Sequence, residues 1–209
     1  MTRAFLHGFA GDPAVWDGIG APAIALPPVQ PTWQANLDAI AAQLGKVDLV
    51  IGYSLGARLA LGLVASGYVP RAILISVNPG IDDHERPARR ANDARWAAML
   101  RTQGIAAFLD AWEAQPLFAT QPRDPGRRAR RLRLDPEQLA RSLETMGLAE
   151  MPDYRAQLDG RCSLVTGALD AKFCAIAAPY PHVEIAGSGH DPLLEQPAAL
   201  ARALRELGA

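Results

Sequence analysis

The sequence has few of the features that mark secreted, membrane-bound or nucleic-acid-binding proteins. Only two cysteines, Cys162 and Cys174, occur among 209 residues, too few for a disulfide framework, so both are expected to be small core residues in a reducing compartment. The formal net charge of −1 gives no overall attraction to nucleic acid. No run approaches the roughly 18 consecutive apolar residues of a membrane span, and Met1–His7 lacks a signal-peptide apolar region. We expect a soluble cytoplasmic protein with no nucleic-acid or membrane partner.

Short apolar stretches alternate with helical patterns over most of the chain. Because buried parallel strands are apolar along their whole length, this alternation predicts a mostly parallel sheet with helices on both faces. Helical spacing of apolar residues predicts covering helices at residues 32–44, 57–64 and 197–207. The six expected strands are Ala4–His7, Ala23–Leu26, Lys46–Ile51, Ala72–Val77, Cys162–Thr166 and His182–Ala186.

One long segment interrupts this alternation. From about residue 82 to residue 150 no stretch resembles a strand, and Leu, Trp and Met recur at helical spacing, as at Trp96, Met99 and Leu100. We therefore expect a single α/β domain over residues 1–209, with a helical cap inserted at about 82–150. The sequence contains no internal repeat and no low-complexity segment.

The stretch Gly52–Gly56, Gly-Tyr-Ser-Leu-Gly, lies between an expected strand and an expected helix. Gly-x-Ser-x-Gly in this position is typical of a nucleophile elbow, a sharp turn that strains the backbone of its serine. Small residues two positions before and after the serine leave room for the neighbouring chain. The turn presents the Ser54 hydroxyl at a helix N-terminus, where backbone N–H groups favour negative charge. The alternative is a glycine-rich turn without a catalytic role.

A catalytic serine needs a histidine to take its proton and a carboxylate to orient that histidine. In folds with this elbow, the acid and then the histidine follow the serine, on loops after late strands. Asp170 comes four residues after Thr166, where one expected strand ends, and His190 comes four residues after the end of the next, at Ala186. Because the carboxyl ends of parallel strands share one edge of a sheet, we expect Ser54 to meet both there.

Other histidines and acids fit these roles less well. His182 begins an expected strand, His84 lies in the helical insert, and His7 ends the first strand, where it is expected to brace a loop. Asp48 is on the wrong side of the elbow turn, and Asp191 adjoins the chosen histidine too closely to fold back onto it. These residues are the alternatives for the histidine and the acid.

Negative charge that develops on a substrate is stabilised by two backbone donors. In this kind of fold, the residue after the nucleophile supplies one N–H group and the loop after the first strand supplies the other. The first donor is therefore Leu55, and the loop is His7–Ala10. We expect the N–H of Phe9 to be the second donor, with its side chain along the pocket.

Arg58 lies four residues after Ser54, on the helix face of the nucleophile, in an otherwise apolar helix. A buried guanidinium without a partner is costly, so Arg58 requires an anionic partner. An internal salt bridge and a substrate carboxylate satisfy this requirement equally well. A substrate carboxylate would argue against a lipase or a hydrolase of simple neutral esters.

Two further arginine groups lie in the insert, Glu85–Arg90 and Arg127–Arg133. Each is consistent with a solvated helix face, and for Arg127–Arg133 this is the interpretation that we favour. Five arginines in this run are also compatible with nucleic-acid binding. That function is not favoured, because Asp135 and Glu137 follow the run and no recognition motif accompanies it.

Together these motifs resemble those of the α/β-hydrolase superfamily. Within it, the chain is similar to the 2-succinyl-6-hydroxy-2,4-cyclohexadiene-1-carboxylate synthase (MenH) family of menaquinone biosynthesis. The tyrosine before the serine, the arginine four residues after it, and the segments Pro116–Phe118 and Asp170–Phe173 are the more particular matches. The matching segments run nearly end to end and are His7–Asp12, Gly52–Arg58, Asn78–Ile81, Glu85–Arg86, Asp93–Trp96, Trp112, Gln115–Phe118, Gly167–Phe173 and Gly189–His190.

The resemblance implies an α/β-hydrolase fold and a triad of Ser54, Asp170 and His190, with no cofactor and no metal. It implies that the triad abstracts a proton from a cyclohexene carboxylate and drives elimination of pyruvate, without an acyl-enzyme. Oxyanion donors and arginines would stabilise the negative charge that spreads onto the substrate. The substrate-binding residues that it implies are Tyr53, Arg58, Arg89, Trp112 and Phe118.

The match to the family has open points. Arg89 is preferred to Arg86 and Arg90 by counting back from Trp96, and the three remain alternatives. The family's leading hairpin is expected to be missing, its glycine-rich segment after the second strand is reduced to Leu26–Pro28, and its usual glutamate two residues before the acid is absent. We expect the shortened loop after Leu26 to leave the pocket more open.

Three functional hypotheses follow. The first is a lyase that eliminates pyruvate, and the second is a serine hydrolase, a carboxylesterase or thioesterase, that acts on a small carboxylated substrate. The third, a non-catalytic binding protein, is disfavoured because the serine, aspartate and histidine are all present. The expected partner is a small-molecule carboxylate, and the sequence does not distinguish a monomer from a homo-oligomer.

Overall fold

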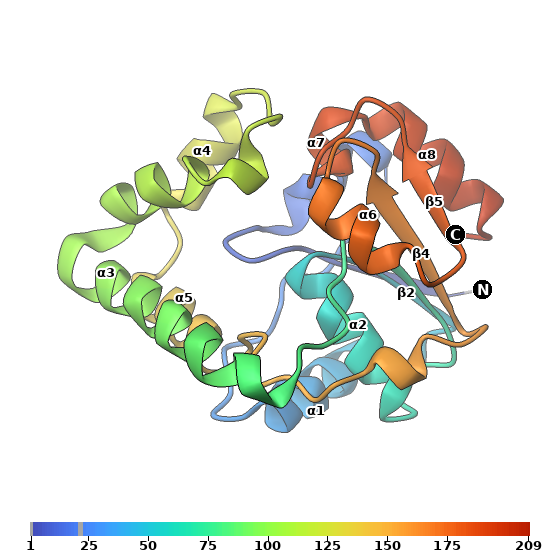
Figure 1. Cartoon of the computed structure of the whole chain (residues 1–209), viewed down its shortest axis with the longest axis horizontal. Helices are drawn as coiled ribbons and strands as arrows, with labels where there is room; N and C mark the ends of the chain where they lie inside the picture. The colour runs from blue at the N-terminus through green and yellow to red at the C-terminus, as the bar shows by residue number, and fades with distance from the viewer. Residues whose placement is uncertain (1, 21–22) are drawn as a thin grey trace.

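The computed structural model describes residues 2–20 and 23–209 and contains an all-parallel sheet (Figure 1). Within the described residues this sheet has five strands, arranged in space in the same order as in the chain. Because all five run in one direction, their carboxyl ends lie at one edge, where ligands bind in open α/β sheets. The strands are β1 (Arg3–Leu6), β2 (Leu49–Tyr53), β3 (Ala72–Ile75), β4 (Cys162–Gly167) and β5 (His182–Ile185).

The second expected strand, Ala23–Leu26, is wrong. Only Ala23 pairs with the sheet, through one parallel bridge to Phe5. The backbone carbonyl of Ala25 accepts a hydrogen bond from the side-chain amide of Gln43 at 2.9 Å instead of one from a neighbouring strand. Pro27–Pro28 follow and supply no N–H groups for pairing. The part of the chain that the structure describes therefore has five strands instead of the expected six.

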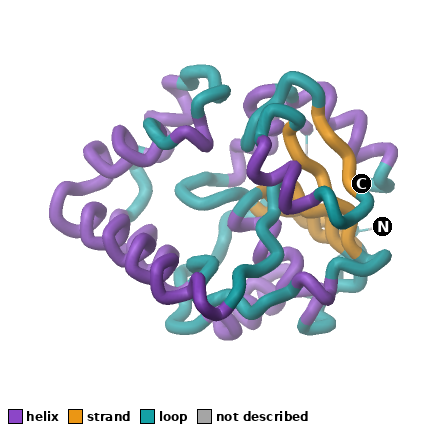
Figure 2. The backbone as a smooth tube through the Cα atoms, in the orientation of Figure 1, coloured by secondary structure: helices purple, strands orange, loops and turns teal. Residues whose placement is uncertain are grey.

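Helices cover both faces of the sheet because alternate residues of a strand point to opposite sides. On one face Val50 and Leu74 pack with α1, α2 and the end of α6, whereas on the other Ile51 and Ile73 pack with η1, α7 and α8 (Figure 2). Each fully buried side chain of this size contributes roughly 1.5–3 kcal/mol through the hydrophobic effect. The covering elements are η1 (Pro13–Ile19), α1 (Trp33–Leu44), α2 (Leu55–Ala65), α6 (Ala171–Ala177), α7 (Pro192–Glu195) and α8 (Pro197–Glu206).

Local chemistry sets the limits of α1. The Thr32 side chain accepts a hydrogen bond from the N–H of Ala35 at 3.1 Å and caps the first turn. Leu37 and Ile40, three residues apart, then face the core. The helix ends at Gly45, whose φ of 60° is readily adopted only by glycine.

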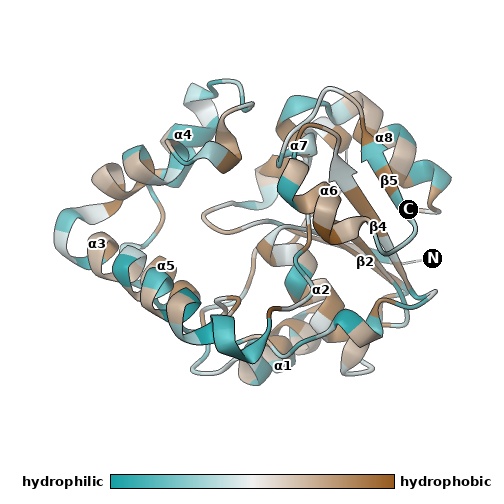
Figure 3. Cartoon of the chain, viewed as in Figure 1, coloured by the Kyte–Doolittle hydropathy of each residue, from teal (hydrophilic) through white to brown (hydrophobic). Residues whose placement is uncertain are grey.

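Between β3 and β4 the described chain forms helices, turns and loops, which we call the cap. Its longest helix, α3, is broken at Gly104, where φ is 77°, and packs against α5 through a cluster that includes Leu100, Phe108 and Leu143. Hydrophobic and hydrophilic residues mix along both helices (Figure 3). The cap elements are η2 (Asp83–Glu85), α3 (Arg86–Glu113), η3 (Pro116–Phe118), α4 (Pro125–Arg131), α5 (Pro136–Thr145) and η4 (Arg155–Gln157).

Two further features bear on the environment of the protein. Cys162 in β4 and Cys174 in α6 are free and only partly buried. Among the described helices none combines the length and the apolar character needed to cross a bilayer.

Candidate active site

Ser54 occupies the sharp turn between β2 and α2. Its φ of 53° and ψ of −106° lie outside the regions that non-glycine residues favour. A Cβ atom at Gly52 would collide with the backbone of Gly56, and one at Gly56 would collide with the backbone of β1 at Leu6. The two glycines are therefore required for the turn, which supports the Ser54 hydroxyl at the start of α2.

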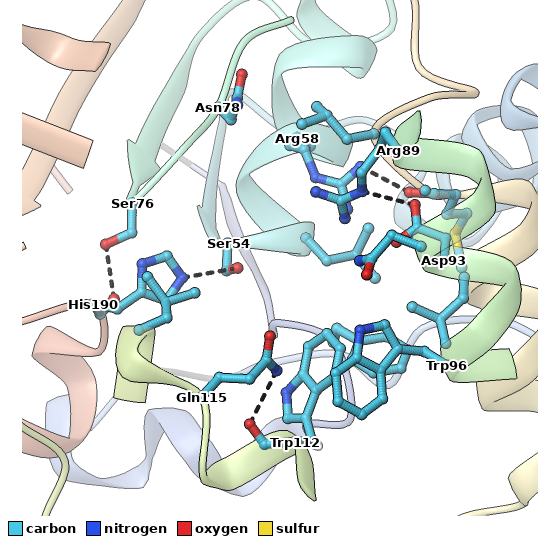
Figure 4. A pocket seen from close by; sticks show the side chains of 18 of the residues that line it. Ser54, Arg58, Ser76, Asn78, Arg89, Asp93, Trp96, Trp112, Gln115 and His190 are labelled. Carbon is cyan, nitrogen blue, oxygen red and sulfur yellow. Dashed lines mark hydrogen bonds and ion pairs between the residues drawn. The ribbon is translucent and has the colours of Figure 1, made fainter. Parts of the chain in front are cut away.

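Asp170, His190 and Ser54 form one chain of contacts at the carboxyl edge of the sheet. Asp170 caps α6 by accepting the N–H of Phe173 at 3.2 Å, and its other carboxylate oxygen lies 2.8 Å from His190 Nδ1. The second ring nitrogen, His190 Nε2, lies 3.2 Å from Ser54 Oγ (Figure 4). Asp170 and His190 are buried, so water does not compete for their contact. This geometry suits transfer of the serine proton to an imidazole that a carboxylate orients.

The backbone around His190 is held from two sides. Ser76, just after β3, donates its hydroxyl to the carbonyl of His190 at 2.8 Å (Figure 4). Glu195 accepts the N–H groups of Gly189 at 2.6 Å and Asp191 at 3.0 Å. The loop that carries His190 is therefore held by contacts with Ser76 and Glu195 as well as by the contacts of the His190 ring.

The alternative histidines lie elsewhere. His7 is buried beside the carbonyl of Gly8, and burial lowers the pKa of its imidazole. His182 contacts the carbonyl of Tyr180 on the outer strand, and His84 is exposed in η2. Of the alternative acids, Asp48 accepts the N–H of Thr2 at 2.7 Å, at the opposite end of β2 from the serine.

The loop after β1 approaches the nucleophile. Gly11 donates its N–H to the carbonyl of Gly8 at 3.1 Å, and Ala10 has a φ of 50°, so the loop turns tightly at Phe9. Within residues 2–20 and 23–209, the backbone N–H groups of Phe9 and Leu55 donate to no other residue. Both groups are therefore available to a developing oxyanion.

Aromatic rings form one wall of a cavity of about 260 Å³ beside Ser54. The Trp112 ring lies 5.0 Å from Phe9 and 6.1 Å from Phe118, measured between centroids. Phe118 and Phe173 also lie 6.0 Å and 4.5 Å from the His190 ring. Trp112 and Phe118 thus line the cavity, and their role in substrate binding stays a prediction.

Arg58 and Arg89 lie side by side on the opposite wall (Figure 4). Arg58 donates to the carbonyl of Met146 at 2.7 Å, and no carboxylate among the described residues comes within ion-pair distance of it. Arg89 pairs with the buried Asp93 at 2.8 Å. Burial, followed by repulsion from Arg89, lowers the pKa of Arg58 to about 9. The sequence left two explanations for Arg58, an internal salt bridge or a substrate carboxylate. Among the described residues it forms no internal salt bridge.

The neighbouring arginines on α3 are occupied elsewhere. Arg86 donates to the carbonyls of Ala149 and Met151, both at 2.8 Å. Arg90 pairs with Glu150 at 2.7 Å on the exposed side of the cap. Of the three alternatives, the structure therefore brings Arg89 to the pocket.

Comparison with known proteins agrees with this architecture. A model of the alpha/beta hydrolase family matches residues 4–203. The chain belongs to the alpha/beta hydrolase family. It is 32% identical over 234 residues to the 2-succinyl-6-hydroxy-2,4-cyclohexadiene-1-carboxylate synthase of Citrobacter koseri, covering 97% of this chain and 92% of that protein.

Solved structures show the same α/β-hydrolase fold. The structure of MenH from S. aureus has a TM-score of 0.87 and 25% identity, covering 98% of this chain and 91% of that one. A thermophilic esterase from Thermogutta terrifontis has a TM-score of 0.76 and 22% identity, covering 98% and 88% of the two chains. The fold expected from the sequence is confirmed, apart from the strand count.

Tyr53 does not line the cavity of this hydrolase fold, contrary to its expected place in substrate binding. Its side chain is buried on the other side of β2, with its ring against Gly8. Burial, followed by the negative charge of Asp191, raises the pKa of its hydroxyl well above the ordinary value. The alternation of side chains along β2 could have predicted this position, because Tyr53 shares a face of the strand with Leu49 and Ile51.

The interpretation of Arg127–Arg133 as a solvated helix face is wrong. Arg127 and Arg131 are buried, and their partners are Asp191 at 2.6 Å and Glu113 at 3.0 Å. Helix α4 lies between the end of α3 and the loop that carries His190. Four arginines of the run form ion pairs with carboxylates, at residues 12, 110, 113 and 191.

Sequence reasoning missed several residues that line the cavity. Asn78 follows β3 and Lys172 lies in the first turn of α6, two residues after Asp170. Both come just after the carboxyl ends of strands, a position that could have identified them. The other missed lining residues include Ser76, Asn92, Trp96 and Gln115.

Proposed function

We propose that the chain is a carbon–oxygen lyase that eliminates pyruvate from a succinyl-enolpyruvyl-hydroxycyclohexene-carboxylate. Relatives named for the synthase of this reaction cover nearly the whole chain. The observation that carries the proposal is Arg58, which lies beside the serine without a carboxylate partner among the described residues. A substrate carboxylate would supply that partner.

In this reaction Ser54 serves as part of a base. His190 Nε2, 3.2 Å away, accepts the hydroxyl proton as Ser54 Oγ removes a proton from the ring carbon next to the substrate's activating group. Asp170, 2.8 Å from Nδ1, stabilises the imidazolium that forms. The electron pair of the broken C–H bond forms a ring double bond, and the C–O bond to the enolpyruvyl group breaks. The departing enolate takes up a proton, which His190 can supply, and becomes pyruvate.

The negative charge of the transition state spreads onto the substrate's carbonyl and carboxyl oxygens. The N–H groups of Phe9 and Leu55 would hold one oxygen, and the guanidinium groups of Arg58 and Arg89 another. Donors fixed in advance stabilise such charge more than water does, because they need no reorganisation during the reaction. Trp112 and Phe118 would pack against the apolar ring edge and exclude water.

A serine hydrolase for a small carboxylated ester or thioester is the second candidate. Its support is the strained Ser54 with two backbone donors beside it that have no acceptor among the described residues, an arrangement that also suits acyl transfer. The two functions differ in their intermediate, because only the hydrolase forms an acyl-enzyme on Ser54.

The test is pyruvate release from the intermediate, followed through a coupled lactate dehydrogenase. The proposal expects rapid release by the wild type, none above background by Ser54→Ala, and a large rise in KM in Arg58→Gln. Arg90→Gln is the matched control, since it removes an arginine of α3 that points to Glu150. Wild-type protein that releases no pyruvate but acylates Ser54 with turnover of activated esters would establish the hydrolase instead.

A further inference from the structure

Helix α4 of the cap contacts the loop that carries His190 through a buried ion pair. Arg127 Nη1 lies 2.6 Å from Asp191 Oδ2, and the two side chains are 9% and 1% exposed. Asp191 directly follows His190 in the chain. Because neither charge has water as an alternative partner, each is held where the other is. The position of Asp191 is therefore tied to that of α4.

The loop around His190 needs such restraints. It begins with Gly187, where φ is 70°, and contains a second glycine at Gly189, so the chain itself is permissive here. Ser76 and Glu195 hold the backbone from the core side. They fix where His190 stands but act only on its main chain. The Asp191 side chain adds a restraint on the far side of the histidine.

A third side chain joins the pair. The Tyr53 hydroxyl is close enough to Asp191, Arg127 and Arg131 for the charges of all three to act on its pKa. Tyr53 directly precedes Ser54, and its ring supports Gly8 in the loop after β1. We call Arg127, Asp191 and Tyr53 the positioning cluster. It connects the cap with the histidine loop and with the residue next to the nucleophile.

The other arginines of α4 have different partners. Arg131 and Arg128 pair with Glu113 at 3.0 Å and 2.9 Å, which binds α4 to α3 inside the cap. Arg130 pairs with Asp12 at 3.0 Å, in the loop after β1. Among the described residues, only Arg127 of this helix pairs with the loop of His190.

We propose that Arg127, acting through Asp191, is a positioning residue that sets the direction of the His190 imidazole from the cap. The proposal rests on the proposed function in one respect, that the triad is catalytic. It gives a role to Arg127, which does not line the cavity beside Ser54. His190 must keep Nδ1 on Asp170 and Nε2 on Ser54 at once, and a small rotation of its loop breaks one contact or the other.

Four variants test the proposal. Arg127→Met removes the guanidinium and keeps the stem, and Arg127→Lys keeps the charge without the planar fork. Arg127→Met with Asp191→Asn removes both charges, so that no lone charge stays buried. Arg128→Gln is the matched control, because it removes an arginine of the same helix that pairs only within the cap.

Three measurements are made on each variant: kcat and KM for pyruvate release, the rate at which a fluorophosphonate labels Ser54, and the melting temperature. The proposal expects Arg127→Met to lower kcat by on the order of tenfold to a hundredfold while KM stays within about twofold. Labelling falls in parallel, Arg127→Lys recovers part of both rates, and Arg128→Gln matches the wild type. The double variant regains most of the melting temperature but not kcat.

A purely structural ion pair gives the opposite pattern. If the double variant regains wild-type kcat and labelling together with its melting temperature, or if Arg127→Met changes KM alone, the positioning role is refuted. The labelling rate also separates the two proposals. Wild-type protein that is labelled quickly but releases no pyruvate refutes the lyase, whereas equal labelling of wild type and Arg127→Met refutes the positioning role.

Discussion

Arg58 offers a direct test of whether the pocket is made for an anionic ligand, because its charge is expected to destabilise the protein when no ligand is bound. Burial, followed by repulsion from Arg89, lowers its pKa from the ordinary value to about 9. At about 1.4 kcal/mol for each pH unit between the two values, the charged form costs up to about 5 kcal/mol at neutral pH. A substitution that removes the guanidinium also removes its hydrogen bond to the Met146 carbonyl. This loss reduces the expected gain in stability by about 2 kcal/mol.

Replacing the guanidinium with an apolar side chain of similar length removes this cost. We expect Arg58→Met to raise the free energy of unfolding by about 1–3 kcal/mol, which corresponds to a melting temperature about 3–10 °C higher for a chain of this size. The same variant should bind substrate poorly. Arg90→Met, whose guanidinium is exposed beside Glu150, is the control and should leave the melting temperature nearly unchanged.

The pH dependence gives an independent check with a definite sign. Below pH 9 Arg58 is charged in both the folded and the unfolded chain, so its full cost is present. Above pH 9 the folded chain releases this proton while the unfolded chain keeps it to a much higher pH, so stability rises. The stability of the wild type relative to Arg58→Met should therefore increase from pH 8 to pH 10.5, in urea titrations at each pH.

The refuting result is equally definite. If Arg58→Met melts well below the wild type and the difference between them does not change with pH, the guanidinium has a stabilising partner inside the protein. The argument for a substrate carboxylate at Arg58 would then fail. A carboxylate ligand that raises the melting temperature of the wild type but not of the variant would support the argument directly.

Three further predictions concern the elbow, the acid and the tyrosine. Gly56→Ala should cost on the order of 3 kcal/mol in chemical denaturation, because its Cβ meets the backbone of β1, whereas Gly160→Ala, with open space around it, should stay within about 0.5 kcal/mol. Asp170→Asn should lower kcat for pyruvate release by on the order of 10³–10⁴ with a nearly normal KM, because His190 loses its charged partner; a small effect would exclude Asp170 as the acid. Tyr53→Phe should leave KM within about twofold, because its side chain is outside the cavity; a tenfold rise would restore Tyr53 to substrate binding.

The elbow and the order of serine, aspartate and histidine could be predicted from sequence because each leaves a short pattern in it. Gly52 is required by the nearby backbone of Gly56, and Gly56 by the backbone of β1 at Leu6. Asp170 and His190 need only follow strands of one parallel sheet to reach the same edge. Neither inference requires knowledge of how distant segments pack.

The predictions that were wrong concern residues whose partners lie far away in the sequence. The segment Ala23–Leu26 has a strand-like composition, but Gln43 of α1 takes one of its carbonyls. Arg127 looks solvated beside four other arginines of its run, and only the fold brings Asp191 to it from 64 positions along the chain. Composition and periodicity describe an element's faces and cannot say which distant carboxylate will cover one of them.

Arg127, Arg89 and Arg58 differ in whether the protein itself supplies a carboxylate for their charge. Arg127 has its carboxylate inside the protein, at Asp191, so its charge is satisfied before any ligand arrives and it can hold a loop in place. Arg89 is likewise satisfied by Asp93. Among the described residues Arg58 donates a hydrogen bond only to a carbonyl oxygen; burial and repulsion from Arg89 lower its pKa, and the charge of Asp93 offsets only part of this. A protein keeps such an unsatisfied charge where function requires it, because a better-paired residue would stabilise the fold and bind the substrate less well. Under the proposed function, a substrate carboxylate would complete the interaction whose absence lowers stability at Arg58.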